Sequence, residues 1–357
     1  MKYILGGTID IAVHEVCDGG SIKEIYRPSG GDWGGTNVDE AFIKFLREIA
    51  GNDAIQRFKD ENVEEYLDLL RDFEAKKRGT DAASKTNIAI KIPPTLFGIV
   101  QGMTQMSLQD KLQASSYEKT VTLTKTKLRL DADVMRSFVC GNLLQMIQHT
   151  SDLLERPECK NVDAILMVGG FSESKFLQEM FKLNFKLPPI VPPKAGLAVL
   201  IGAVIYGHRP TAITERKSIY TYGIKSTADY NDKIHPLSKR SVFKDGSVLC
   251  VDVFSIIVRE GDTLVVGRVH NERSYFPIYE SQKVMIIPIF TSRDRNSKFT
   301  TDPGCKQVGS LQVPLAGIGT NRSVTVRMLF GGTEIIVECV EEATKRIRRL
   351  NIDFLTY

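Results

Sequence analysis

The sequence predicts an α/β fold for residues 1–208, followed by a mostly antiparallel β domain over residues 209–357. In the first part, amphipathic helical stretches alternate with short apolar runs that end in glycine turns, which is typical of strands connected to helices. After Pro210, helical periodicity largely disappears, and short strand-like runs separated by turns take its place. This change of pattern predicts a domain boundary near residues 208–212.

The expected elements of the α/β domain follow from periodicity and from turn residues. Strands are predicted at residues 3–5, 9–13, 22–26, 88–92, 121–130 and 162–168. Helices are predicted at residues 38–49, 63–78, 134–154 and 195–206, with one more that carries residues 176–181. Asp131 or Asp133 is expected to cap the helix that starts at residue 134, and Ser172 is expected to cap the next one.

The expected β domain consists of short strands joined by turns. These strands are predicted at residues 219–224, 248–258, 263–269, 284–290, 310–313, 323–330 and 333–340. Gly331-Gly332-Thr333 lies where the last two runs meet and is predicted to be a hairpin turn. The basic run from Lys345 to Arg349 is expected to be a solvated face, with an acidic partner as the alternative.

The composition is that of an ordinary globular protein, with 42% hydrophobic and 25% charged residues among 357. A formal net charge of +4 gives no argument for a nucleic-acid partner, and none is expected. The six cysteines form no C-x-x-C pair or zinc-like spacing, so reduced thiols and a cytoplasmic location are expected. No signal peptide is recognisable. Residues 195–206, the most apolar run, are too short to span a bilayer and are expected to form a buried helix.

Two glycine turns have the backbone properties that a phosphate site needs. Glycine has no Cβ and tolerates positive φ, so consecutive glycines let N–H groups approach an anion closely. Gly6-Gly7-Thr8 lies between two predicted strands, and the Thr8 hydroxyl adds a hydrogen-bonding group. Gly169-Gly170 lies between a predicted strand and a helix, where N–H groups favour an anion or the polar edge of a nucleotide. Either turn alone also fits a purely structural role, so the specific signal is their order along the chain.

Four motifs in a fixed order carry a resemblance to a known family. They are Gly6-Gly7-Thr8-Ile9-Asp10, Gly31-Asp32-Trp33-Gly34-Gly35-Thr36-Asn37-Val38-Asp39, Phe73-Glu74-Ala75-Lys76-Lys77-Arg78 and Val168-Gly169-Gly170-Phe171-Ser172-Glu173-Ser174. The set resembles the second lobe of the nucleotide-binding domain of 70-kDa heat-shock proteins, and most closely the divergent heat shock 70 kDa protein 12 subfamily. The resemblance covers nearly the whole chain, including residues 352–357.

This resemblance implies lobe II of an actin-like ATPase (ribonuclease H-like) fold over residues 1–208, with a helical/β insertion at about residues 38–119. It implies a substrate-binding-like β domain over residues 209–357. It also implies twelve residues that bind ATP or ADP with Mg²⁺. Those expected at the phosphates and near the metal waters are Gly6, Gly7, Thr8 and Asp10. Those expected around the rest of the nucleotide are Gly34, Gly35, Glu74, Lys77, Arg78, Gly169, Gly170 and Phe171.

No catalytic residue and no direct metal ligand is expected, and residues 74–78 have a solvated charged helix end as their alternative interpretation. Tyr3 stands where the family has an Asp that helps to hold the magnesium shell, and Leu5 replaces the first glycine. The acidic residue expected near Pro192-Pro193-Lys194 is also missing. The family's first lobe, which brings its own phosphate loop and catalytic lysine, has no counterpart in this sequence. Because phosphoryl transfer needs charge stabilisation from several directions, no appreciable ATPase activity is expected from this chain alone.

Three functions are compatible with these observations. The first is an ATP/ADP-binding, chaperone-like protein, N-terminally truncated, whose β domain holds protein or peptide clients at a strand edge formed by residues 323–330 and 333–340. A β domain that only packs and stabilises is the alternative for that region. The second is a non-catalytic interaction or scaffold protein that retains the fold but not nucleotide turnover. The third, a sugar or acetate kinase of the same superfamily, is disfavoured because no sugar-binding carboxylate is recognisable near the phosphate loops.

Overall fold

The computed structural model describes residues 2–4, 7–80, 85–243, 245–330 and 334–353. The fold is mixed α/β, as predicted, and it divides into two compact units. Unit 1 comprises residues 1–13 and 29–205, and unit 2 comprises residues 14–28 and 206–357. No helix in the described ranges is long and apolar enough to cross a lipid bilayer.

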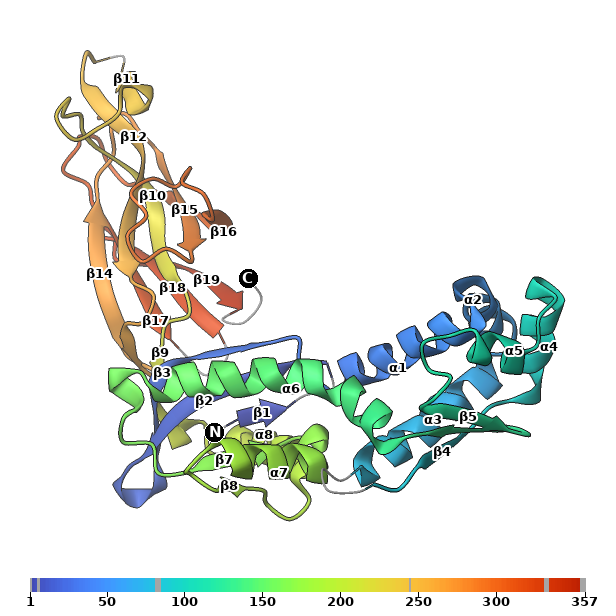
Figure 1. The fold of residues 1–357 in the computed structure, drawn as a ribbon. Helices are drawn as coiled ribbons and strands as arrows, with labels where there is room; N and C mark the ends of the chain where they lie inside the picture. The colour runs from blue at the N-terminus through green and yellow to red at the C-terminus, as the bar shows by residue number, and fades with distance from the viewer. Residues whose placement is uncertain (1, 5–6, 81–84, 244, 331–333, 354–357) are drawn as a thin grey trace. The chain divides into compact units, whose positions relative to one another are not determined.

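Unit 1 begins with a strand, a turn and a hairpin (Figure 1). The strands are β1 (Lys2–Ile4), β2 (Ile9–Val16), β3 (Ile22–Gly31), β7 (Ile165–Val168) and β8 (Pro189–Ile190). β1 pairs antiparallel with β2 and parallel with β7, and β7 pairs parallel with β8. The hairpin is so tight at its base that a Cβ on Gly30 would clash with the carbonyl oxygen of Ile9, which explains the glycine there.

Between β3 and β7, the described residues form six α-helices and a small sheet. The helices are α1 (Gly35–Ala50), α2 (Asn52–Glu61), α3 (Val63–Gly79), α4 (Pro94–Thr104), α5 (Leu108–Gln113) and α6 (Ala132–Leu154). The sheet strands, in the order β4-β6-β5, are β4 (Ile88–Lys91), β6 (Lys127–Leu130) and β5 (Val121–Thr124). The single strand predicted over 121–130 is therefore wrong: the chain turns at Lys125, whose φ is +53°, and the two halves pair antiparallel.

Aromatic stacking holds α1 against α3 and α6. The rings of Phe42 and Phe73 are stacked with centroids 4.0 Å apart and an angle of 4° between their planes. Phe138 of α6 meets both rings edge-on at 6.1 Å. Phe42 and Phe73 are fully buried, so this contact holds the middle of α1 beside the last turns of α3.

Two predicted helix caps need correction. Ser172 does not cap α7 (Lys175–Asn184), because a 3₁₀ turn over Gly170–Glu173 delays the start of the helix. Its Oγ donates instead to the carbonyl oxygen of Gly169 at 2.6 Å, and Ser174 accepts from the Leu177 N–H. Asp131 holds the N-cap position of α6 without a side-chain cap bond.

The helix predicted to be buried, α8 (Ala195–His208), is mostly exposed. Within the described part of the chain, Ala195 is the one buried residue of α8. Its carbonyl oxygen accepts a hydrogen bond from the Gly169 N–H at 2.8 Å. Leu200 and Ile201 are at least half exposed. This apolar run has no polar face that would mark a solvent side, so its composition predicted a burial that most of α8 does not have.

Unit 2 contains the tip of the β2–β3 hairpin and three groups of strands (Figure 1). β9 (Ile213–Lys217) pairs parallel with β3, and β13 (Thr263–Val265) pairs antiparallel with β9. A five-stranded sheet has the order β11 (Arg240–Val242), β12 (Val248–Val258), β10 (Thr221–Asp229), β15 (Val284–Ser292) and β16 (Lys306–Pro314). A four-stranded sheet has the order β14 (Val269–Tyr275), β17 (Val324–Phe330), β18 (Glu334–Glu341) and β19 (Arg346–Asp353).

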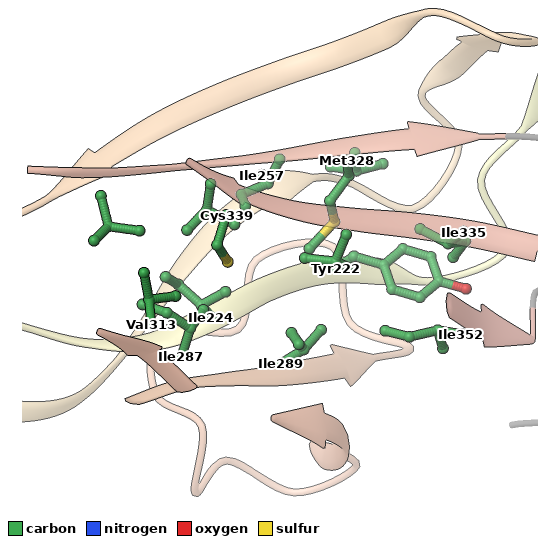
Figure 2. Packing of buried hydrophobic residues seen from close by; sticks show 14 of the residues in the cluster. Tyr222, Ile224, Ile257, Ile287, Ile289, Val313, Met328, Ile335, Cys339 and Ile352 are labelled. Carbon is green, nitrogen blue, oxygen red and sulfur yellow. The ribbon is translucent and has the colours of Figure 1, made fainter. Parts of the chain in front are cut away.

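The inner faces of these two sheets form one apolar core, shown in Figure 2. Tyr222 and Ile224 from β10 lie with Met328 of β17 and Cys339 of β18, all nearly excluded from solvent. The antiparallel β character predicted for this region is thereby observed. The strand predicted at 263–269 is wrong, because Gly267, with φ of +76°, separates β13 from β14.

Two further β-domain predictions concern a strand edge and a basic run. β17 and β18 are each paired on both sides, so they are not the strand edge that was predicted to hold peptides. The basic run 345–349 lies largely in β19 and is exposed, as expected for a solvated face, and Arg349 Nε donates to Glu338 Oε1 at 2.6 Å. The turn predicted at Gly331-Gly332-Thr333 lies outside the described residues.

The contrast between the aromatic contact and α8 gives a stability prediction. Phe73→Ala should lower the free energy of unfolding by about 3–5 kcal/mol, because it leaves a cavity under Phe42 and Phe138. Leu200→Glu should change it by less than about 0.5 kcal/mol, because the side chain is already exposed. Urea unfolding followed by the fluorescence of Trp33, the one tryptophan of the chain, measures both. Equal losses in the two variants would contradict the assigned burial.

Candidate functional site

A small cavity lies in unit 1 where the start of α1, the end of α3 and the turn after β7 come together. Its volume is about 240 Å³. The lining residues are Gly35, Thr36, Asp39, Glu74, Lys77, Arg78, Gly170, Phe171 and Ser174. Pockets that enclose drug-sized ligands measure roughly 300–1,000 Å³, so this cavity is large enough for only part of such a ligand.

Six of the twelve residues predicted to bind nucleotide line this cavity, although they come from three separate segments. They are Gly35, Glu74, Lys77, Arg78, Gly170 and Phe171. Sequence reasoning missed Thr36, Asp39 and Ser174. Thr36 and Asp39 are three residues apart on α1, so they share a helix face directly after the Gly34-Gly35 pair; that spacing was the available signal.

Of the other predicted residues, Gly7, Thr8, Gly34 and Gly169 lie in turns next to the elements that line the cavity, and Asp10 lies in β2. The Gly34 N–H donates to the carbonyl oxygen of Gly7 at 3.1 Å, and a Cβ on Gly7 would lie 3.1 Å from Thr36 Oγ1. Thr8 Oγ1 donates to Asp10 Oδ2 at 3.3 Å. Gly169 has a φ of +96°, a conformation that favours glycine. Gly6 lies outside the described residues.

Lys77 is the electrostatic centre of the cavity wall. Its side chain is only 5% exposed. Its Nζ donates to Asp39 Oδ1 at 2.7 Å, to the carbonyl oxygen of Gly35 at 3.1 Å, and to Glu74 Oε2. Because a buried ammonium needs compensating acceptors, this bridge ties the end of α3 to the start of α1.

The two carboxylates respond differently to this environment. At Asp39, burial raises the pKa above its ordinary value, against the hydrogen bond and charge of Lys77. At Glu74, burial also opposes ionisation, but hydrogen bonds from Lys77 and Arg78 outweigh it and hold the pKa below its ordinary value. Glu74 is therefore the more readily ionised of the two carboxylates, and the negative charge of Asp39 is less well compensated.

Arg78 lies at the mouth of the cavity. Its Nε donates to Glu74 Oε1 at 2.8 Å, and its side chain is 56% exposed. A planar guanidinium held at one edge presents a face on which an aromatic base can stack. The alternative interpretation of this run, a solvated charged helix end, thus fits Arg78 in part and does not fit Lys77, which is buried.

The described residues contain no group of three or more His, Cys, Asp or Glu side chains arranged to hold a metal ion. Beside the Gly7–Thr8 turn, the acidic side chain is Asp10, which is exposed. Mg²⁺ usually keeps several waters and binds through one or two carboxylates plus substrate phosphates. A lone Asp10 fits a magnesium ion that arrives with phosphates, and it does not by itself form a metal cage.

Unit 2 has a larger hollow of about 1,280 Å³. It is lined by parts of β10, β12 and β15, together with residues 273–278. Phe276 and Ile286 are both about 60% exposed in its wall, and Lys225 and Asp252 form an ion pair of 2.6 Å there. The hollow therefore combines open apolar side chains with charged groups.

The chain is related to the 70-kDa heat-shock proteins. It is 34% identical over 369 residues to heat shock 70 kDa protein 12A of Mus musculus and 33% identical to the same protein of Homo sapiens; each match covers 100% of this chain and 54% of the relative. It is 32% identical over 365 residues to heat shock 70 kDa protein 12B of Homo sapiens, covering 98% of this chain and 53% of the relative. No family model matches the chain.

Identity of this extent along the full chain confirms the predicted relationship to the heat shock 70 kDa protein 12 subfamily. The chain spans about half the length of the curated relatives it matches.

The Lys77 bridge gives a second stability prediction. Lys77→Met should destabilise unit 1 by about 2–3 kcal/mol, because two carboxylates lose their shared cation. The loss should fall somewhat short of the roughly 3–5 kcal/mol typical of fully buried pairs, because Asp39 and Glu74 are partly exposed. Lys76→Met, a change at the neighbouring exposed residue, is the matched control, with less than about 0.5 kcal/mol expected. Equal unfolding midpoints in urea for both variants would contradict the bridge.

Proposed function

We propose that unit 1 binds an adenine nucleotide, with the base and ribose in the cavity and the phosphates toward Gly7 and Thr8. The observation that carries this proposal is the convergence of six predicted nucleotide-binding residues on one cavity. They belong to segments that begin at residues 35, 74 and 170, so their meeting is not a trivial result of sequence proximity. The Arg78 guanidinium offers a stacking face for adenine.

The phosphate end of the proposed site follows from local backbone geometry. The Gly7–Gly34 hydrogen bond links the turn after β1 to the residue that caps α1. The N–H groups at the start of this 16-residue helix favour negative charge. Asp10 and the Thr8 hydroxyl would hold waters of a magnesium ion that enters with the phosphates. The ion would neutralise phosphate charge there.

We further propose that this unit corresponds to lobe II of an actin-like ATPase fold, with 1–208 and 209–357 as the two domains. The function is that of an ATP/ADP-binding, chaperone-like protein of the type-12 group, with little hydrolysis by this chain alone. Asp10 is the one acidic residue among those proposed at the phosphates, whereas phosphoryl transfer needs stabilisation from several sides. A non-catalytic interaction protein is the alternative, and binding of ADP without turnover of ATP would favour it.

Nucleotide binding is tested by calorimetry of Mg-ADP with the purified chain and with Gly170→Leu. A Cβ on Gly170 meets no atom within 4 Å, so a larger side chain should fit the fold while filling the cavity. Binding should weaken at least tenfold. Gly98→Leu is the matched control: it is an exposed glycine with similar open space, outside the cavity. Unchanged affinity in Gly170→Leu would refute this placement of the nucleotide.

As a second function, we propose that the hollow of unit 2 binds extended peptide segments of client proteins. Its exposed Phe276 and Ile286 support this proposal, because such apolar anchors usually dominate peptide recognition. Backbone hydrogen bonds to neighbouring strands and pockets for alternate side chains are the general means of binding extended chains.

Fluorescence anisotropy with a labelled peptide of alternating apolar and polar residues tests the second function. Phe276→Ser should weaken binding about tenfold, because it removes an aromatic anchor. Ile318→Ser changes a side chain that is 82% exposed and lies outside the hollow, and it should leave binding unchanged. Equal affinities for the two variants would exclude the hollow as the peptide site.

A further inference from the structure

Strand β19 is an edge of the four-stranded sheet of unit 2, and its charges indicate what can pair with it (Figure 1). Within the described part of the chain, β19 pairs with β18 on one side and with no strand on the other. We propose that this edge binds an extended acidic segment of a protein partner as an added strand. The surface shares no residue with the cavity of unit 1 or the hollow of unit 2.

The backbone of β19 is held in a regular strand. Its register with β18 is unbroken over all eight residues, Arg346–Asp353. On the inner face, Leu350 packs so closely on β16 that a Cβ on Gly309 would lie 2.5 Å from Leu350 Cδ2. An edge strand directs the N–H and C=O groups of alternate residues away from its neighbour. These groups can therefore pair with an added strand at little cost in conformational entropy of β19.

The edge carries positive charge on both faces of the strand. Arg346, Arg348 and Arg349 are all exposed. Arg348 lies opposite Cys339, a residue of the apolar core, and so belongs to the inner face. Arg349 lies opposite Glu338 on the outer face, and its side chain is 63% exposed. Among the described residues, Arg348 has no ion-pair partner, so its charge is available to a ligand.

On the outer face, Arg349 ends a row of alternating charges that crosses the sheet. The row consists of Glu272 in β14, Arg327 in β17, Glu338 in β18 and Arg349, each opposite the next in register. Glu338 accepts from Arg349 Nε at 2.6 Å and from Arg327 Nε at 2.7 Å. Burial opposes the ionisation of Glu338, but these hydrogen bonds outweigh it and hold its pKa below the ordinary value. An added strand would continue the row with an acidic side chain opposite Arg349.

The opposite edge of the same sheet, β14, lacks these properties. Its charges have both signs, because Glu272 is followed by Arg273. Its register with β17 shifts between Val269 and Glu272, and such an irregularity disrupts the ladder at an edge. The regular edge of uniform charge is therefore that of β19.

The charges also decide between possible occupants of the β19 edge. A second copy of β19 would bring arginines beside arginines, and like charges on neighbouring strands repel each other. A nucleic acid has no backbone N–H and C=O groups at strand spacing, and a flat anionic membrane would meet the arginines of one face only. A polypeptide strand supplies both requirements, because its successive side chains point to opposite faces. Glutamate or aspartate on both faces would match Arg348 and Arg349.

The experiment measures the fluorescence anisotropy of a labelled peptide of glutamate, threonine and valine with the purified chain. A second peptide of the same charge has proline in place of each valine and cannot donate ladder hydrogen bonds there. Wild-type protein should bind the first peptide at least about tenfold more tightly than the second. Arg348→Glu should weaken binding of the first peptide about tenfold, because attraction becomes repulsion. Lys233→Glu, the matched control, makes the same charge change at an exposed residue outside β19 and should change binding less than about twofold.

Each other outcome would contradict the proposal. If the glutamate peptide does not bind, or if the proline peptide binds equally well, β19 does not accept an added strand. Equal affinities in Arg348→Glu and Lys233→Glu would place the peptide elsewhere, and a loss in Phe276→Ser would place it in the hollow of unit 2. Single-stranded RNA that binds as tightly as the peptide would overturn the choice of partner. Should Arg348→Glu not fold, the comparison of the two peptides on wild-type protein still decides.

Discussion

The hydrogen bonds and ion pairs of the buried Lys77 ammonium group hold helices α1 and α3 of unit 1 together. Lys77 lies 42 residues from Gly35 and 38 residues from Asp39, yet its ammonium group binds both. A buried charge without such partners would cost several kcal/mol, so the end of α3 is held where the backbone and side chain of α1 supply acceptors. The stacked rings of Phe42 and Phe73 bring the same two helices together from the apolar side. Both contacts hold the same two helices, α1 and α3, together, and the cavity lies between the start of α1 and the end of α3.

The fold was predictable where the spacing of apolar residues fits a helix or a strand but not both. The apolar positions of α1 recur at helical spacing and are buried as predicted, and the strand Val248–Val258 was predicted with the bounds that the structure gives it. The predictions failed where a tight turn uses an ordinary residue, as at Lys125 between β5 and β6. β19 was not predicted, because its several arginines make the segment look like a charged surface run. In the sheet, such a charge is paired with the neighbouring strand, as Arg349 is with Glu338.

The site was predictable only in part, and the division has a physical reason. Glycine turns and the Glu74–Arg78 run are local motifs, so the resemblance placed them directly. Asp39 ends one of the four motifs, but the sequence assigned it no role, because its hydrogen bond is to Lys77 on another helix. Whether Lys77 points to solvent or to protein is likewise decided by tertiary contacts. The exposure of α8 shows the same limit, because apolar composition alone does not say which surface covers a helix.

The central claim is that the unit 1 cavity is where an adenine nucleotide binds. Hydrogen–deuterium exchange of the purified chain, with and without saturating Mg-ADP, tests it most directly, because it locates protection along the sequence. The account predicts slower exchange at the start of α1, at the end of α3 and in the turn after β7, with little change in unit 2. Protection confined to unit 2, or none under saturating nucleotide, would contradict it.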